Sequence, residues 1–262
     1  MEKSLKEWVS ILLNVLINQD SPSFWIEQER ENGNLGFFFP ELYECFGVKQ
    51  NSFHKYDLYY HLLYSCDHAV KKLNVRLAAL MHDIGKVETK SFMENDNDYV
   101  FYKHELVGAK KAYKIMKKWD LDDNLIKNVV RLIRFHMFHY KEYWTDSAVR
   151  RFINKVGIDN IEDLFYLRVA DREGNGFRRG EPQKLKLFRN RIFSVIEEEK
   201  KFKIKDLDIS GNDIMSLGIS EGPMVGKVLK YLYEKVINGE VQNNKDKLII
   251  LAESFISNCY LK

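Results

Sequence analysis

Apolar residues recur along most of the chain at the three- and four-residue spacing of amphipathic helices. Near the N-terminus, Leu5, Trp8, Leu12 and Leu16 follow this spacing and would share one face of a helix. Leucine, isoleucine, lysine and glutamate are abundant and only four prolines occur, which favours helix further. No stretch alternates convincingly between apolar and polar positions as a half-buried strand would. The pattern predicts an all-α protein.

Capping and turn-forming residues indicate where these helices begin and end. Pro40 suits a first helical turn, Ser210 suits an N-cap, and Gly85 is expected to end the helix before it as a C-terminal cap. Residues 94–98 are polar and are expected to form a loop. The longer helices are expected near residues 5–16, 56–73, 75–83, 102–119, 122–136, 146–156, 160–175, 183–200, 223–238 and 245–260.

The chain is expected to contain three parts, because the character of the sequence changes around residue 203. There, residues 206–213 are loop-forming and interrupt the helical pattern. We therefore predict an N-terminal helical segment over residues 1–50 that packs on the core, a helical-bundle domain over residues 51–200, and a small helical tail over residues 201–262.

The composition is that of an ordinary globular protein, with 45% hydrophobic and 30% charged residues. No apolar run approaches the roughly 20 residues of a membrane-spanning helix, and the first residues carry charges of both signs without a cleavable signal pattern. Cys45, Cys66 and Cys259 are odd in number and widely spaced, which is typical of reduced thiols. We expect a cytoplasmic protein with no membrane partner.

His82 and Asp83 form the most informative motif, because they follow directly on the apolar run 77–81. Burying a polar group without a partner costs about 2–7 kcal/mol, and burying a charge costs more. Adjacent helical residues point about 100° apart, so these two side chains converge only on something that lies between them. A metal ion satisfies this condition, whereas a structural hydrogen bond is the alternative.

Further candidate metal ligands are dispersed along the chain in an order that chance rarely produces: His61, His104, His136 and Asp171. Imidazole and carboxylate ligands without thiolates suit a divalent ion of Mn, Mg, Ni, Co, Fe or Zn. Water bound to such an ion becomes acidic enough to supply a hydroxide that attacks phosphorus. Asp171 could instead pair with Arg168 or Arg172.

Other residues near these candidates have less specific patterns. Lys86 could neutralise a substrate phosphate or pair with the carboxylate three residues before it. His139 lies close to the helical face of His136 and could replace it, although a solvated side chain is the common outcome. His68 would share the helical face of His61, but a structural or solvated side chain is the more common outcome for both His54 and His68, and we assign neither of them to the site.

Basic residues are concentrated in one segment, although the formal net charge is only +3. Residues 168–205 contain 12 Lys and Arg against six Asp and Glu, including Arg178 and Arg179, and they are preceded by Arg150 and Arg151. A footprint for RNA phosphates would explain this bias, and binding would then weaken steeply with salt. A solvated helical face is the more common explanation of such a segment.

Together these motifs resemble the HD-domain superfamily of metal-dependent phosphohydrolases. A closer resemblance is to the C-terminal half of bacterial CCA-adding tRNA nucleotidyltransferases, over roughly residues 20–255. It is carried by residues 39–42, 54–61, 78–86, 103–109, 149–153 and 206–226. The resemblance implies an HD-domain helical bundle followed by a small C-terminal helical subdomain that helps to hold the tRNA body.

The resemblance also implies roles for the candidate residues. The primary metal ligands would be His61, His82, Asp83 and Asp171. His104 and His136 fall where two-metal HD proteins have further ligands, so one or two divalent ions per chain are expected. We assign Asp83 and Lys86 as the catalytic residues.

One departure from the family concerns activity. The nucleotidyltransferase head of these enzymes begins with a Gly-Ser dipeptide and a pair of carboxylates, and no Gly-Ser dipeptide occurs here. We expect a metal-dependent phosphohydrolase that acts on nucleotide or RNA-end phosphoesters, as a 2′,3′-cyclic phosphodiesterase or a phosphatase, and does not add CCA by itself. The alternative is a tRNA-binding subunit, the HD-and-tail half of a split CCA-adding enzyme, that partners a separate nucleotidyltransferase head.

Overall fold

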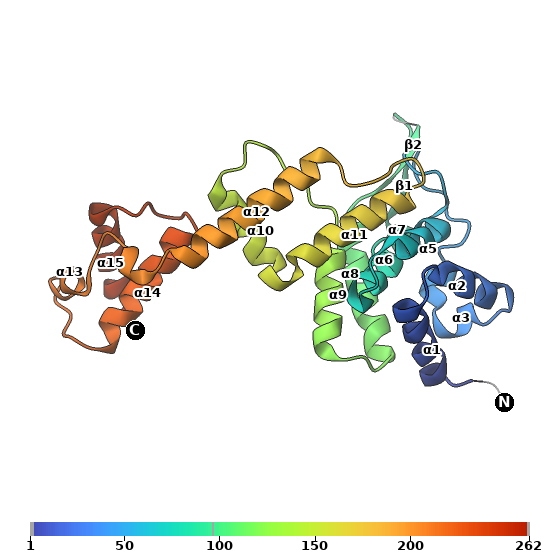
Figure 1. The fold of residues 1–262 in the computed structure, drawn as a ribbon, viewed down its shortest axis with the longest axis horizontal. Helices are drawn as coiled ribbons and strands as arrows, with labels where there is room; N and C mark the ends of the chain where they lie inside the picture. The colour runs from blue at the N-terminus through green and yellow to red at the C-terminus, as the bar shows by residue number, and fades with distance from the viewer. Residues whose placement is uncertain (1–2, 96, 261–262) are drawn as a thin grey trace. The chain divides into compact units, whose positions relative to one another are not determined.

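The computed structural model describes residues 3–95 and 97–260, and nearly all of its regular structure is helical (Figure 1). The prediction of an all-α protein is therefore confirmed. The chain divides into two compact units, and each unit is formed by two separate stretches of sequence. Unit 1 comprises Met1–His139 and Val156–Pro182, and unit 2 comprises Tyr140–Lys155 and Gln183–Lys262.

Unit 1 contains most of the helices and the only strands among the described residues. Its elements are α1 (Leu5–Asn18), α2 (Pro22–Glu31), α3 (Leu35–Phe38), α4 (Pro40–Tyr43), α5 (Leu58–His68), α6 (Leu73–Met81), α7 (Lys86–Thr89), β1 (Lys90–Met93), β2 (Asp98–Phe101), α8 (His104–Lys118), α9 (Asp123–Phe135), η1 (Ile158–Asn160) and α11 (Ile161–Gly174). Unit 2 contains α10 (Asp146–Val156, whose last residue is counted in unit 1), α12 (Gln183–Lys201), η2 (Ile204–Asp206), α13 (Gly211–Met215), α14 (Pro223–Ile237) and α15 (Lys245–Tyr260). The expected three-part division of the chain stays a prediction. Within the described ranges, no helix has both the length and the hydropathy needed to cross a bilayer.

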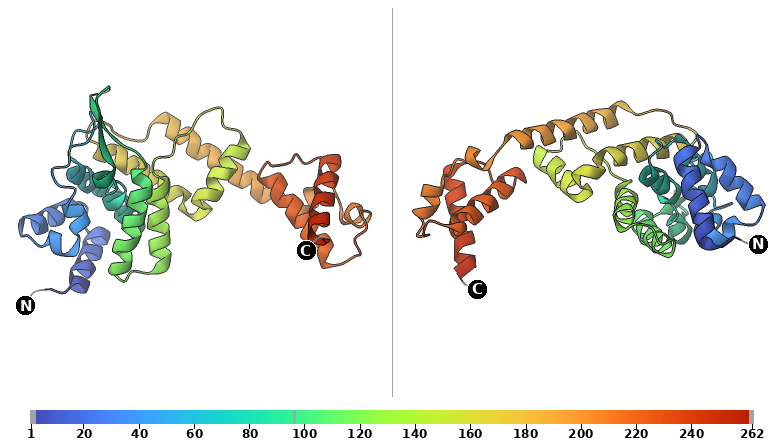
Figure 2. Two further views of the ribbon diagram at one scale, coloured as in Figure 1. Left: turned by 180° about the vertical axis from the view of Figure 1, so that it is seen from behind. Right: turned by 60° about the horizontal axis from the view of Figure 1, so that its bottom comes forward.

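The core of unit 1 is formed by α5, α6, α9 and α11, which pack against one another. In the helix α6, Leu77, Ala78 and Met81 are inaccessible to solvent and even Arg76 is buried, as is typical of a helix at the centre of a core. The N-terminal helices cover this core, with α1 against α6 and α2 against α5 (Figure 2). His82 and Asp83, which directly follow α6, therefore lie in the interior.

Gly85 does not end α6 as a left-handed cap, so this expectation was wrong. Its φ is −70°, a conformation that any residue adopts. A Cβ atom at this position would lie 2.3 Å from the carbonyl oxygen of His104 and 2.5 Å from the backbone nitrogen of Gly108. Glycine is needed here because two backbone segments approach closely, and this approach holds α8 against the residues that follow α6.

The strands β1 and β2 form an antiparallel hairpin that the sequence did not predict. In it, Ser91 pairs with Val100 and Phe92 pairs with Tyr99. Each strand has only four residues and neither alternates between buried and exposed positions, so no periodicity marks them. Of the polar loop expected at residues 94–98, residues 94, 95 and 97 connect the two strands and Asp98 already belongs to β2, while residue 96 lies outside the described residues.

Unit 2 has a hydrophobic core of its own, formed by α13, α14 and α15. Ile214, Val228 and Leu248 are inaccessible to solvent within it. Ser210 caps α13, as its sequence context predicted. The Ser210 hydroxyl accepts the N–H of Asp213, and the Asp213 carboxylate accepts the N–H of Ser210 in return.

In the other part of unit 2, residues 140–155 pack against α12 through aromatic side chains. The ring of Tyr140 stacks on that of Phe188 at a centroid distance of 4.2 Å. The rings of Trp144 and Phe152 lie 5.7 Å and 5.2 Å from the same Phe188 ring. Because Phe188 is completely buried, these contacts attach the first stretch of unit 2 to the second.

Candidate metal centre

Five helices of unit 1 bring the six predicted metal ligands to one point in the interior. The residues are His61 on α5, His82 and Asp83 directly after α6, His104 at the start of α8, His136 directly after α9, and Asp171 on α11. All are buried except Asp171, whose side chain is 14% exposed. None of the six lies outside the cluster.

The four residues predicted as primary ligands are in mutual contact. The Nε2 atom of His61 lies 3.1 Å from Nε2 of His82. It lies 3.3 Å from Oδ2 of Asp83 and 3.4 Å from Oδ1 of Asp171. Atoms bound to one ion at about 2.0–2.2 Å, at right or tetrahedral angles, are about 2.8–3.6 Å apart. The observed separations match this range.

Asp83 connects this group to the other two histidines through its second oxygen. Its Oδ2 lies 3.3 Å from Nε2 of both His61 and His82. Its Oδ1 lies 3.1 Å from Nε2 of His104 and 3.4 Å from Nε2 of His136. Oδ1 is buried and accepts no hydrogen bond of good geometry from the described residues. One carboxylate thus faces two separate sets of imidazole nitrogens, as a ligand that bridges two ions would.

The backbone fixes the orientation of three of the imidazole rings. In His82, His104 and His136, Nδ1 lies 2.9, 2.7 and 2.7 Å from the carbonyl oxygen of the residue three positions earlier. A carbonyl oxygen can only accept, so Nδ1 carries a proton in each of these rings, and Nε2 is the atom left to coordinate a metal. Nε2 is the atom that faces the cluster in all three rings, which is the usual orientation of imidazoles that coordinate a metal.

The buried carboxylates make the cluster favourable for a cation. Burial acts to raise the pKa of Asp83, but Lys86 and His82 hold this pKa well below its usual range, so the carboxylate is ionised. Burial likewise acts to lower the pKa of His82, yet the charges of Asp83 and Asp171 raise it to about 10. A divalent ion would supply the positive charge that this arrangement favours.

Two cations border the cluster, and each pairs with one of its two carboxylates, whereas the catalytic role expected for Lys86 stays a prediction. Nζ of Lys86 lies 2.6 Å from Oδ2 of Asp83 and donates to Oε1 of Gln50 at 2.8 Å, so Lys86 pairs with the carboxylate. Arg168 binds Oδ2 of Asp171 at 2.7 Å, while Oδ1 of Asp171 faces the histidines. Pairing with arginine therefore does not remove Asp171 from the cluster.

His54 lies beside the cluster, although the sequence analysis did not assign it. Its ring centroid is 5.2 Å from that of His61, and one of its nitrogens lies within 4.8 Å of ligand atoms of His61 and Asp83. His54 belongs to the loop before α5, where helical periodicity gives no information about direction. His139 is exposed, whereas His136 is buried, so the buried residue of this pair faces the cluster.

The four arginines predicted to bind RNA phosphates are divided between the two units. Arg178 and Arg179 are exposed in the segment that follows α11 in unit 1. Arg150 and Arg151 lie on α10 in unit 2. The two pairs therefore do not form one cluster within either unit.

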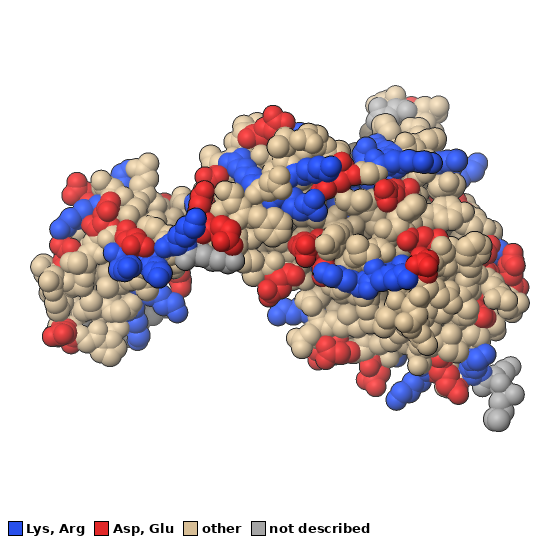
Figure 3. Space-filling model, viewed as in Figure 1, with Lys and Arg blue, Asp and Glu red and all other residues tan. Residues whose placement is uncertain are grey.

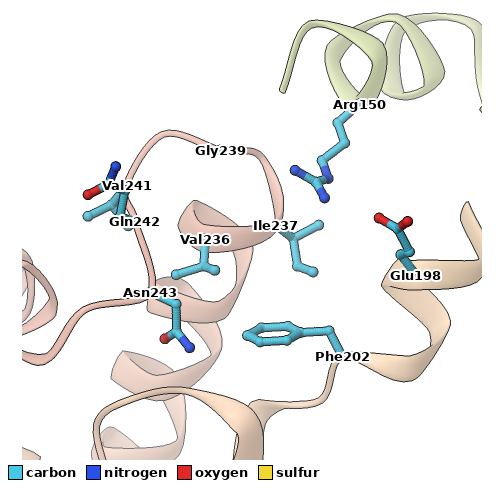
Figure 4. Close-up of a pocket in the computed structure, with 9 residues that line it drawn as sticks. All are labelled: Arg150, Glu198, Phe202, Val236, Ile237, Gly239, Val241, Gln242 and Asn243. Atoms are coloured by element: carbon cyan, nitrogen blue, oxygen red, sulfur yellow. The ribbon is translucent and has the colours of Figure 1, made fainter. Parts of the chain in front are cut away.

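Basic residues of unit 2 differ in their exposure to solvent and in their acidic neighbours. Arg150 lines a cavity of about 470 Å³, and Glu198 points toward the same cavity (Figure 4). On α12, Lys184 and Lys186 are exposed, whereas Arg191 forms an ion pair of 2.8 Å with Asp146, the first residue of α10. Acidic residues are interspersed with basic ones over the face drawn in Figure 3, so the positive segment does not extend into a broad patch there.

Comparison with known proteins identifies the family. A family model described as "tRNA nucleotidyltransferase domain 2 putative" matches residues 100–252, which is more than half of the chain. The chain therefore belongs to this tRNA nucleotidyltransferase family. The resemblance to CCA-adding enzymes is confirmed, whereas membership of the HD superfamily stays a prediction.

Two curated relatives are similar to most of this chain. The A-adding tRNA nucleotidyltransferase of Deinococcus radiodurans is 31% identical over 222 residues, which cover 80% of this chain and 49% of the relative. The CC-adding tRNA nucleotidyltransferase of Thermus thermophilus is 31% identical over 220 residues, which cover 82% of this chain and 49% of the relative. The chain spans about half the length of these relatives.

Proposed function

We propose that this chain provides the tRNA-binding half of a tRNA nucleotidyltransferase, with a tRNA and a nucleotidyltransferase head as its partners. The observation that carries the proposal is the family match over residues 100–252, a range that includes most of unit 2 and part of unit 1. Exposed cations support it, because Arg178 and Arg179 in unit 1 and Lys184 and Lys186 in unit 2 are accessible to phosphates.

Binding of tRNA is expected to depend on Arg178 and Arg179. Each phosphate that a cation neutralises releases counterions, so log affinity should fall by about 0.9 per phosphate for each tenfold rise in salt, if the value for duplex DNA applies. The double variant Arg178→Gln, Arg179→Gln should bind tRNA more weakly, with a salt slope shallower by about 2. Filter binding at several salt concentrations measures both quantities.

The matched control is the double variant Lys110→Gln, Lys114→Gln, which removes the same charge from two exposed positions of α8. Equal losses in the two double variants would mean that net charge alone determines binding. An unchanged salt slope after removal of the two arginines would contradict their contact with phosphates. A single-stranded RNA of equal length should bind less tightly than tRNA, since the tail is proposed to recognise folded RNA.

A second function is favoured by the buried His/Asp cluster: hydrolysis of nucleotide or RNA-end phosphoesters, as in the HD superfamily that the chain resembles. A divalent ion bound there would supply Lewis acidity. His61, His82, Asp83 and Asp171 would hold one ion, and Asp83 with His104 and His136 would hold a second. Lys86 keeps the Asp83 carboxylate ionised and in place. The names of the relatives concern nucleotide addition, so the comparisons favour the tRNA-binding function over this one.

Hydrolysis of 2′,3′-cyclic AMP, 2′-AMP or 3′-AMP is the expected activity when Mn, Ni, Co or Mg is supplied. The variant His61→Asn should lower turnover by more than about 100-fold, because even outer-shell partners of metal ligands affect activity by about 10–100-fold. His139→Asn is the matched control, since His139 is exposed outside the cluster. Release of phosphate or of the ring-opened nucleotide is measured by chromatography. Absence of turnover with all four metals would leave tRNA binding as the function.

A further inference from the structure

A pocket of about 390 Å³ lies in unit 1 between the loop before α5 and the β1–β2 hairpin. Its volume is within the range of small-molecule sites. Side chains that line it include Lys49, His54, Lys55, Tyr56, Phe92 and Tyr99. Ser52 attaches the loop to the hairpin, because its backbone N–H and its hydroxyl both donate to Oδ2 of Asp98, at 2.9 and 2.7 Å. The two walls are therefore tied together.

Two side chains that line the pocket contact residues of the His/Asp cluster or its border. His54 lines the pocket, and its ring centroid lies 5.2 Å from that of His61. Gln50 also lines the pocket, and its Oε1 accepts a hydrogen bond from Lys86, which is paired with Asp83. A molecule in the pocket would thus be separated from the cluster by single side chains.

In the part of the chain that the structure describes, the lysines of this pocket form no ion pairs with its carboxylates. Asp57 and Asp98 both line the pocket, but both accept backbone N–H groups. Lys49, Lys55 and the adjacent Lys90 have no carboxylate within ion-pair distance among the described residues. Burial and the charge of Lys49 lower the pKa of Lys90, as expected for two ammonium groups without an anion between them. A phosphate group would supply these lysines with an anionic partner.

Aromatic rings face the same pocket. Phe92 is 50% exposed, and its ring centroid lies 5.3 Å from that of Tyr99. Nζ of Lys90 lies 4.0 Å from the centroid of the Tyr99 ring, which places a cation against that ring as well. Accessible rings beside lysines match the chemistry of a nucleotide, because bases stack on aromatic faces while cations bind the phosphate.

We propose that this pocket binds the terminal nucleotide of a phosphate-bearing substrate, with the base against Phe92 and the phosphate held by Lys49 and Lys55. A free mononucleotide and the 3′ end of an RNA share this chemistry. The role of the ligand as a substrate rests on the proposed phosphohydrolase function. Binding itself depends only on the pocket, so the two proposals can be tested separately.

The first test is calorimetric titration of the full chain with 3′-AMP, adenosine and inorganic phosphate in EDTA, which removes bound ions and prevents hydrolysis. Phe92→Ala should weaken 3′-AMP binding by about fivefold or more, because a stacked base is lost, and should leave phosphate binding unchanged. Lys49→Gln with Lys55→Gln should weaken 3′-AMP and phosphate by about tenfold or more and leave adenosine unchanged.

Matched controls are available on other faces of unit 1. Phe24→Ala removes a ring that is 79% exposed on α2, and Lys114→Gln removes an exposed charge from α8. Both should bind 3′-AMP as the wild type does. Wild-type affinity in Phe92→Ala, or an equal loss in Phe24→Ala, would overturn the proposal.

A second measurement uses the wild-type chain and does not depend on the folding of variants. 3′-AMP should protect Lys49 and Lys55, but not Lys114, from acetylation by acetic anhydride, mapped by mass spectrometry. Equal acetylation with and without 3′-AMP would overturn the proposal.

Competition identifies the source of the nucleotide. The competitor is a trinucleotide with a 3′-phosphate. If it displaces 3′-AMP at a concentration lower than that of 3′-AMP, the site is supported and the ligand is an RNA end. If an equal or higher concentration is needed, the site is supported and the ligand is a mononucleotide. Failure of both compounds to bind contradicts the pocket assignment. Binding of 3′-AMP without any hydrolysis would contradict the phosphohydrolase function alone.

Discussion

Replacing Asp83 by asparagine should remove tightly bound metal from the chain. The variant keeps the size of the side chain but removes the charge that faces all four histidines of the cluster. Because Asp83 contacts both imidazole sets, we expect the wild type to hold two divalent ions and the variant to lose both. Elemental analysis of protein purified without chelators measures this occupancy.

Asp159→Asn is the matched control, because Asp159 is an exposed carboxylate outside the cluster. It should bind metal as the wild type does. Metal-free wild-type protein that also fails to take up Mn, Ni, Co or Mg from solution would contradict the metal-centre assignment. Retention of both ions in Asp83→Asn would contradict the bridging role of this carboxylate.

The same substitution should also lower stability, because Lys86 would keep its charge but lose its anionic partner. Breaking a buried ion pair from one side costs about 3–5 kcal/mol. The double variant Asp83→Asn, Lys86→Met should recover part of this loss without recovering metal. Chemical unfolding of the single and double variants therefore separates the effect of the ion pair from the effect of the metal.

Replacing Gly174 by alanine should destabilise unit 1 strongly. A Cβ atom there would lie 2.2 Å from Oγ of Ser65, 2.5 Å from its backbone nitrogen and 2.7 Å from its Cα. Because two of these atoms belong to the backbone of α5, the helices α5 and α11 would have to move apart. Overpacking of this kind costs about 1–3 kcal/mol, and we expect a value at the upper end for contact with backbone atoms.

Gly226→Ala is the control for this substitution, since Gly226 lies inside α14 and nothing is within 4 Å of the position of its Cβ. It should raise the free energy of unfolding by up to about 1 kcal/mol through helix propensity alone. Urea unfolding followed by circular dichroism compares the two variants. A neutral or stabilising Gly174→Ala would show that α5 and α11 tolerate a wider separation.

The helices could be predicted because the periodicity and capping residues that indicate a helix lie within a short stretch of sequence. The expected segment at residues 146–156 coincides with α10, and the segment at residues 183–200 differs from α12 by one residue. The helix expected at residues 56–73 is shorter, because Asp57 caps its start and Ala69 adopts an extended backbone at its end. Capping determines such boundaries more closely than hydrophobic periodicity does.

The features that could not be predicted from the sequence depend on contacts between residues far apart in the chain. The six cluster residues could be recognised by type and order, but only the fold brings their ligand atoms close enough together to share an ion. The sequence suggests that Gly85 is needed for a left-handed helix cap, whereas the structure shows that glycine is needed because the backbone of α8 approaches it closely. His54 and the β1–β2 hairpin are positioned by contacts such as that between Ser52 and Asp98, which are 46 residues apart and leave no periodic trace.

Because each unit is formed by two separate stretches of sequence, the gene cannot be divided into one fragment for each unit. The chain leaves unit 1 after His139, comes back after residues 140–155, and leaves again after Pro182. A gene fragment that stops at Pro182 would encode the ring of Tyr140 without Phe188, on which it stacks. Neither unit is encoded by one uninterrupted stretch of DNA, so recombination or cloning can transfer a complete unit only together with a piece of the other.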